Sequence, residues 1–177
     1  GTDVTNTADV SCTATAATVG NSTLTASPTT VDADGSTTST MTLQAKDANG
    51  NNLSAGGLTV TMTESGSATL STVFDNTDGT YTATITSTTA ETVTVTAAIG
   101  GTDVPNTADA SFTATAATVG NSTLTASPTT VDADGSTPST MTLPAKDANG
   151  NNHIAGGLPA SIPRSVPATP VTVCAHQ

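Results

Sequence analysis

Positive charge and aromatic side chains are both scarce in this sequence. Lysine and arginine together number 3 among 177 residues, against 14 aspartates and glutamates, and the formal net charge is -11. Because so few cations cannot form a basic patch that neutralises phosphates, neither nucleic acid nor an anionic membrane surface is expected as a partner. With 1 tyrosine, 2 phenylalanines and no tryptophan, an aromatic platform for a glycan is not expected either.

Long apolar runs are missing too. The sequence has no apolar stretch of about 18 residues, no signal-peptide pattern, and a glycine rather than a methionine at residue 1. Transmembrane helices and export signals both need apolar runs. We therefore expect an internal fragment of a longer protein, whose export signal lies outside this sequence.

What the sequence does contain is a long internal repeat. Residues 17–52 return at residues 117–152, a shift of 100 residues, with Thr38 and Gln44 replaced by proline. A period of this length is that of a small domain rather than of a short solenoid repeat. We predict a tandem array with three parts: residues 1–16 as the last strand of a preceding repeat, 17–116 as a complete domain, and 117–177 as a truncated and degenerate second domain.

Apolar and polar residues alternate along most of the complete repeat, as in strands with one buried face. The alternating apolar sets are Met41, Leu43 and Ala45; Leu58, Val60 and Met62; Tyr81, Ala83 and Ile85; Val93, Val95 and Ala97; and Ala108, Ala110, Phe112 and Ala114. Roughly seven short strands separated by turn sequences, with no helical periodicity, predict an all-β fold, an immunoglobulin-like antiparallel β-sandwich in tandem repeats.

Four residues of the complete repeat are expected to have structural roles. Asp78 and Gly79 end an Asn-Thr-Asp-Gly turn that directly precedes a late strand. Tyr81, at the start of that strand, is placed to form a tyrosine corner, with its hydroxyl bonded to the backbone a few residues upstream. Phe112 is assigned to the core.

Several motifs in order resemble a known family. They are STLTASPTTVDADG, the KDANGN loop, DNTDGTYTATITSTTAETVTVTA and the closing TADASFT. Over residues 21–116 in full, and 1–16 and 117–158 in part, the sequence resembles the bacterial immunoglobulin-like domain of the invasin/intimin type. The resemblance implies tandem sandwiches in bacterial surface adhesins, most of them spacers. Receptors are bound there by a terminal domain with a lectin-like module, which nothing here resembles, so no binding residue is carried over.

The expected function is therefore a structural spacer of an exported bacterial adhesin, at the cell surface and anchored in the outer membrane, or secreted. Its expected partners are neighbouring repeats of the same chain, with a host-cell or glycan receptor reached through domains outside this sequence. Two alternatives stay open: an immunoglobulin-like module that itself binds a glycan or host protein, and linker repeats of a secreted enzyme.

Residues suited to catalysis or metal binding are few. The only histidines, His153 and His176, replace Leu53 and Asn76 of the complete repeat, so no catalytic triad is expected. Asp32 and Asp34 could contribute oxygens to a calcium site, but the sequence favours turn formation, because an EF-hand loop starting at Asp32 would place a leucine where a glutamate is required. No cofactor and no metal are predicted.

The second copy departs from the first increasingly towards its end. Residues 1–58 and 101–158 differ at seven positions, whereas the next 19 pairs differ at fourteen. Pro144 and Pro159 fall inside predicted strands, where proline removes a hydrogen-bond donor. The rising number of differences reflects decaying sequence quality, a degenerating gene end, or drift in a terminal repeat. We expect residues 17–116 to fold and residues 159–177 not to fold.

The 2 cysteines of the sequence occupy repeat positions of aromatic residues. Cys12 corresponds to Phe112, and Cys174 to Phe74. We interpret each cysteine as the substitution of a core aromatic residue. The alternative is a disulfide bridge between repeats.

Overall fold

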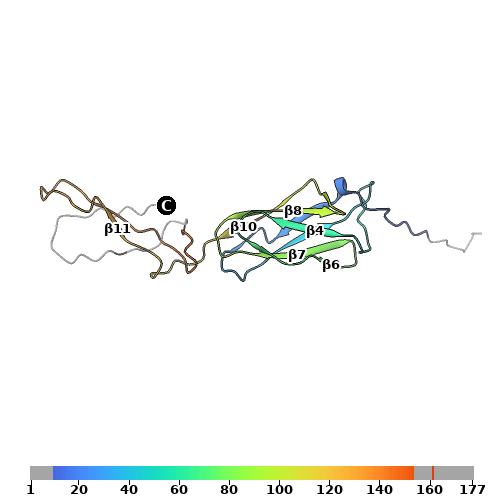
Figure 1. Ribbon diagram of the computed structural model, residues 1–177, viewed down its shortest axis with the longest axis horizontal. Coiled ribbons are helices and arrows are strands. Elements are labelled where there is room, and N and C mark those ends of the chain that lie inside the picture. Colours follow the sequence, from blue (N-terminus) through green and yellow to red (C-terminus); the bar gives the residue numbers. More distant parts are fainter. Residues whose placement is uncertain (1–9, 154–160, 162–177) are drawn as a thin grey trace, which may run out of the picture.

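Two β-sheets packed face to face make up the larger part of the structure (Figure 1). The computed structural model describes residues 10–153 and residue 161. Its elements are the short 3-10 helix η1 (Val19–Asn21) and the strands β1 (Thr23–Ser27), β2 (Thr30–Asp32), β3 (Ser39–Gln44), β4 (Val60–Glu64), β5 (Thr69–Leu70), β6 (Phe74–Asp75), β7 (Thr80–Thr86), β8 (Thr92–Ile99), β9 (Thr102–Asp103), β10 (Ala108–Thr113), β11 (Thr125–Ser127) and β12 (Thr140–Thr142).

Strands β1–β10 form the sandwich. One sheet has the order β1-β3-β7-β5, with β6 also on β7; the other has the order β2-β10-β8-β4, with β9 also on β8. The predicted all-β, immunoglobulin-like fold is confirmed. All described strand pairs are antiparallel except β2 with β10, which run parallel. Because β1 and β2 belong to different sheets, the chain crosses between them at Pro28, a residue type that is confined to edge strands and bends because it has no backbone N–H.

The core lies between the two sheets and follows the predicted alternation. In β3 the side chains of Met41 and Leu43 are fully buried, and in β8 those of Val93 and Val95 are too. Each such side chain contributes about 1.5–3 kcal/mol when it leaves water. Phe112 of β10 is also buried in this cluster.

One core assignment is wrong. Phe74, taken as a core aromatic from its correspondence with Cys174, is 67% exposed. Phe74 lies opposite Thr82 in the β6–β7 pair, and residues directly opposite each other project from the same face of a sheet. The neighbours of Thr82 in β7, Tyr81 and Ala83, are buried, so Thr82 and Phe74 lie on the outer face.

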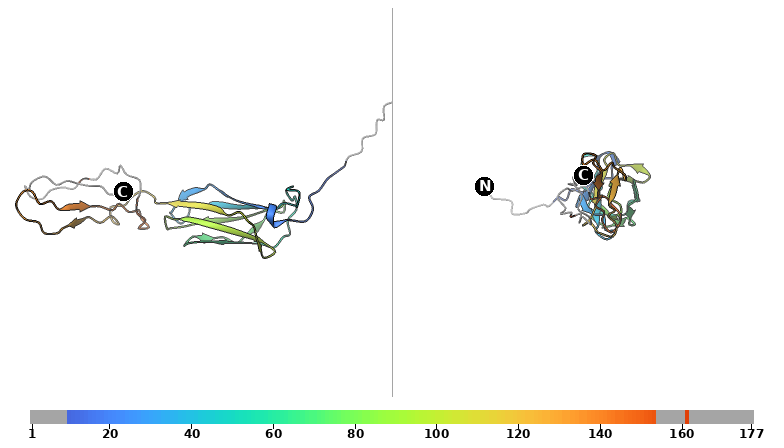
Figure 2. Two further views of the ribbon diagram at one scale, coloured as in Figure 1. Left: turned by 90° about the horizontal axis from the view of Figure 1, so that it is seen from above. Right: turned by 90° about the vertical axis from the view of Figure 1, so that its left-hand side faces the viewer.

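The second copy of the repeated sequence, residues 117–153, lies beyond one end of the sandwich along its long axis, and residues 10–16 leave from the opposite end (Figures 1 and 2). It contains β11 and β12, which pair over three residues each, whereas β1 and β3 pair over five. β12 ends at Thr142, two residues before Pro144. The predictions for Pro159 and for 159–177 fall outside the described residues, apart from residue 161.

Candidate interface between successive units

A buried aspartate organises the loop that follows β3. Asp47 is 1% exposed, and its Oδ1 accepts the backbone N–H groups of Asn49 and Asn51, each at 2.9 Å. Its Oδ2 accepts the side-chain Nδ2 of Asn51 at 3.1 Å, and Gly50 takes the positive φ of 81° that closes the turn. The DANGNN loop is thus folded around one carboxylate.

The same carboxylate holds the chain segment that enters the sandwich. The backbone N–H of Thr15 donates to Asp47 Oδ2 at 3.2 Å, and Asn21 Nδ2 donates to the backbone oxygens of Asp47 and Ala48. The side-chain hydrogen bond from Asn51 and the backbone bonds from Thr15, Asn51 and Asn49 lower the pKa of Asp47 from 3.8 to about 2. The carboxylate is therefore ionised and joins the segment around Thr15 to the DANGNN loop.

The second copy builds this arrangement again. Asp147 is fully buried and accepts the backbone N–H groups of Asn149 and Asn151 at 2.9 Å each, and that of Thr115 at 3.1 Å. Burial alone would raise the pKa of Asp147, but the hydrogen bonds from Asn151, Thr115 and Asn149 outweigh it and hold the pKa below 3.8.

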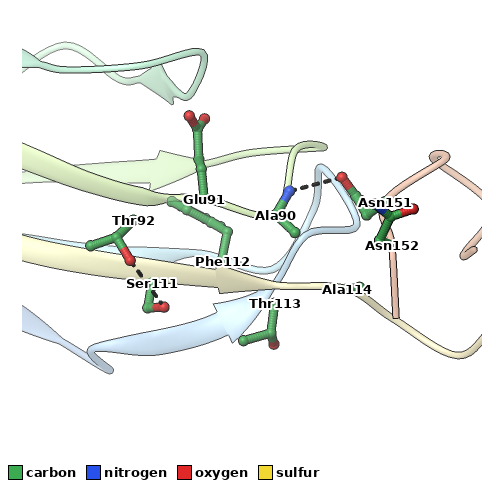
Figure 3. Close-up of a pocket in the computed structure, with 9 residues that line it drawn as sticks. All are labelled: Ala90, Glu91, Thr92, Ser111, Phe112, Thr113, Ala114, Asn151 and Asn152. Atoms are coloured by element: carbon green, nitrogen blue, oxygen red, sulfur yellow. Dashed lines mark hydrogen bonds between the residues drawn. The ribbon is translucent and has the colours of Figure 1, made fainter. Parts of the chain in front are cut away.

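Three hydrogen bonds join this second loop to the end of the sandwich, and Figure 3 draws the one between Ala90 and Asn151. Asn149 Nδ2 donates to the backbone oxygen of Ala33 at 2.8 Å. Asn151 Nδ2 donates to the backbone oxygen of Thr88 at 2.9 Å, and its Oδ1 accepts the backbone N–H of Ala90 at 2.8 Å. All three groups on the sandwich side belong to the main chain of loops, one after β2 and one between β7 and β8.

A pocket of about 400 Å³ lies beside these bonds, between the sandwich and the second loop. Its one carboxylate is that of Glu91, whose Oε1 already accepts hydrogen bonds from Ser67 and Ser87. The remaining lining consists of small and polar residues and Phe112, so the pocket presents no acid–base pair or nucleophile with a base.

The structure places the four residues singled out by sequence as follows. Tyr81 is buried, and its hydroxyl accepts the backbone N–H of Leu58 at 2.9 Å, so its partner lies 23 residues upstream rather than a few. Asp78 Oδ1 accepts the N–H and the hydroxyl of Thr80, which holds the pKa of Asp78 below its usual value. Gly79 has φ 85°, and Phe112 lies in the core as described above.

The other candidates also form local hydrogen bonds. Asp34 accepts the backbone N–H groups of Ser36 and Thr37 and the hydroxyl of Thr37, a turn arrangement that lowers the pKa of Asp34. Within residues 10–153, no three His, Cys, Asp or Glu side chains are grouped so that they could hold a metal ion. The backbone N–H of His153 donates to Ala145. Cys12 is exposed and has a free thiol, while His176 and Cys174 lie outside the described residues.

The sequence indicated the KDANGN loop only as one of the motifs shared with a known family, and Asp47, Asn149 and Asn151 were not predicted to have a role. One signal for them exists. Residues 45–52 and 145–152 are identical, although the positions on either side, 44 and 53, both differ between the copies. No described helix is long and apolar enough to cross a membrane.

Comparisons with known proteins agree with the architecture. The model of a family described as invasin, domain 3, matches residues 18–115. Among solved structures, invasin, described as a bacterial integrin-binding protein, is 34% identical with a TM-score of 0.67, over 78% of this chain and 28% of that one. InvD of Yersinia pseudotuberculosis is 34% identical with a TM-score of 0.62, over 74% and 38%. FdeC, an Escherichia coli adhesin, is 30% identical with a TM-score of 0.54, over 78% and 44%.

This chain spans less than half of each of these proteins, and no curated protein matches it. The family match covers more than half of the chain and confirms the resemblance that the sequence motifs indicated. The chain belongs to the invasin domain 3 family, the bacterial immunoglobulin-like domains of cell-surface adhesins of the invasin/intimin type.

Proposed function

We propose that the chain is a structural spacer of its adhesin, that it catalyses no reaction, and that it sets the distance and direction between neighbouring parts of a longer surface protein. The observation that carries this proposal is the joint between the sandwich and the second loop. There Asn149 and Asn151 make three hydrogen bonds to the sandwich, at 2.8, 2.9 and 2.8 Å.

The linker supports the same proposal. β10 ends at Thr113, and Thr115 is already bound to the carboxylate of Asp147. Thr118 donates its N–H to Lys146 at 2.7 Å, so little free chain is left between the two units. A short linker fixed at both ends restricts the bending that flexible linkers allow. We propose that successive units form a semi-rigid rod.

The composition fits a spacer better than a receptor-binding module. The one tyrosine is buried, as is Phe112, which leaves Phe74 as the one aromatic side chain exposed among residues 10–153. Hot spots of protein interfaces are enriched in tryptophan, tyrosine and arginine. We therefore propose that any host or glycan receptor is bound by parts of the adhesin outside this chain, and that anchoring in the outer membrane is likewise provided elsewhere.

The test is binding by the whole chain. The purified chain is applied to a glycan array and to immobilised integrins, with invasin as the positive control for integrin. A spacer gives no signal above that of an unrelated β-sandwich. Saturable binding by this chain would contradict the proposal and favour the binding-module alternative.

A further inference from the structure

We infer that Asn49 and Asn51, at the opposite end of the sandwich from the joint, form a docking face for the end of a preceding unit of the same kind. This inference rests on the proposed spacer function and names its partner. The preceding unit would present main-chain groups at its positions equivalent to Ala33, Thr88 and Ala90.

The first argument is that both loops have the same internal geometry. Three backbone N–H groups meet the carboxylate at 3.2, 2.9 and 2.9 Å around Asp47 and at 3.1, 2.9 and 2.9 Å around Asp147. The amide of Asn51 or Asn151 completes each set. The backbone of Asn49 and the side-chain amide of Asn51 are therefore fixed in the first loop as those of Asn149 and Asn151 are in the second.

The second argument concerns polar groups left without a partner. Asn49 and Asn51 are exposed. Within the described part of the chain, Asn49 Nδ2 and Asn51 Oδ1 make no hydrogen bond, whereas the equivalent atoms of Asn149 and Asn151 bond to Ala33 and Ala90. The donor of Asn49, the acceptor of Asn51 and the second N–H of the Asn51 amide therefore remain at this end, and their counterparts are the three groups that the other loop uses for docking.

The third argument is the chemistry of the receiving end. The groups bound by the second loop are two backbone oxygens and one backbone N–H, so none of these three hydrogen bonds uses a side chain of the receiving unit. A preceding unit with the same fold can receive the loop even where its sequence differs. The segment leading into Thr15 supports such a neighbour, because residues 1–16 repeat residues 101–116 with three substitutions, at positions 5, 10 and 12.

The test compares two joints in two chains. The native chain carries spin labels at Thr61 and Thr125, both exposed, after replacement of Cys12 and Cys174 by serine. A lengthened chain, in which residues 1–116 are followed directly by 17–177, carries labels at both copies of Thr61. Distances are measured by pulsed electron paramagnetic resonance.

The matched variants are Asn49→Asp and Asn149→Asp. Each substitution replaces the Nδ2 donor by an oxygen that repels the backbone carbonyl it should meet. The backbone N–H of the substituted residue still donates to Asp47 or Asp147. In the native chain, Asn149→Asp should replace the single narrow distance by a broad distribution, and Asn49→Asp should leave it unchanged. In the lengthened chain, Asn49→Asp is placed in the second of the two sandwiches, whose first loop faces the new joint. This substitution should broaden the distance across that joint. The alanine variants should give the same pattern.

The inference is overturned if Asn49→Asp and Asn49→Ala both leave the new joint as narrow as in the unsubstituted chain. It is also overturned if the native chain forms a concentration-dependent dimer that Asn49→Asp abolishes, since the partner would then be a second molecule. Neither outcome touches the spacer function. Saturable binding on the arrays would instead overturn the function and leave the joint unaffected.

Discussion

The two copies of the repeated sequence differ in their strands and agree in their loops. Leu24 is 2% exposed and its identical counterpart Leu124 is 47% exposed; Val31 and Val131 are 6% and 39% exposed. Asp47 and Asp147, in contrast, are 1% and 0% exposed. Identical strand residues are therefore buried in the first copy and exposed in the second, whereas the aspartate of the loop is buried in both copies.

The reason is the sequence distance of their partners. The carboxylate of Asp147 finds its donors within 32 residues, in Thr115, Asn149 and Asn151. The strand β3 needs β7, which begins 36 positions after Gln44, and the sandwich closes only when β10 is added. The counterparts of β7, β8 and β10 would be numbered above 177 and are not in this sequence. The loop forms from local contacts, whereas burial of the strands depends on partners far along the chain.

The largest expected effect is the loss of stability when a buried strand residue of the first copy is truncated. Leu24→Ala should lower the free energy of unfolding of the sandwich by about 2–5 kcal/mol, because it leaves a cavity under β1. Leu124→Ala, the matched control, should change it by less than about 0.5 kcal/mol, because that site is half-exposed. The fluorescence of Tyr81, the single tyrosine of a chain without tryptophan, reports chemical denaturation of the sandwich alone. Equal losses for both variants would contradict the comparison.

A glycine pair tests a close approach at the base of the first loop. A Cβ on Gly79 would lie 2.0 Å from the backbone oxygen of Leu53, whereas one on Gly50 would meet nothing within 4 Å. Both have positive φ, 85° and 81°, and this conformation alone costs an alanine about 1–2 kcal/mol. In the same denaturation assay, Gly79→Ala should therefore lose clearly more stability than Gly50→Ala. Equal losses of stability would show that the Leu53 carbonyl moves away from the new Cβ without destabilising the sandwich.

The sandwich could be predicted from the sequence because its signal is periodic. Alternation at Met41, Leu43 and Ala45 indicates one buried face, and the structure buries all three. The parallel pairing of β2 with β10 could not be predicted, since a three-residue strand carries no period. Phe74 was misplaced because hydrophobicity alone does not say on which side of a two-residue strand a side chain projects.

The interface was the harder part to predict. Asparagine in DANGNN is typical of turns, and only the fold brings Asn149 to Ala33, 116 residues away. The same holds for Asn106, whose side chain bonds to both the N–H and the carbonyl of Leu24. Amide side chains that substitute for a strand partner leave no pattern in a single sequence, because their partners are main-chain groups that every residue has.

Acid should release both loops together. The pKa of Asp47 is about 2 in the folded chain against 3.8 ordinarily, and that of Asp147 is lowered too. A lowered folded-state pKa contributes stability that is complete above 3.8 and is lost as the pH falls through about 2. Amide exchange of Thr15 and Thr115, followed by nuclear magnetic resonance between pH 5 and pH 2, should quicken on acidification beyond the change in free peptides. Amides in the middle of β3 should not. Acid release of Thr15 alone would show that the two carboxylates are not equivalent.

The smallest effect is expected at Pro144. In the first copy, Gln44 extends β3 and its side chain donates to the backbone oxygens of Ala45 and Gly79; Pro144 has no backbone N–H to offer a neighbouring strand. Pro144→Gln restores the backbone N–H. The side-chain bond that Gln44 makes to Gly79 cannot form, because Gly79 has no counterpart within the 177 residues. The gain should therefore be at most about 1 kcal/mol, that of a single hydrogen bond.

This gain is read from amide exchange rather than from unfolding. If Pro144 sets the end of β12, the variant should slow exchange at Thr142 relative to the native chain as the pairing with β11 lengthens, and its new amide at position 144 should exchange more slowly than in a free peptide. If Thr142 exchanges as in the native chain, and the new amide at position 144 exchanges as fast as in a free peptide, the end of β12 is set instead by the missing neighbour strand. The difference between β3 and β12 would then follow entirely from distant partners, and the proline would be tolerated there because no strand partner needs its N–H.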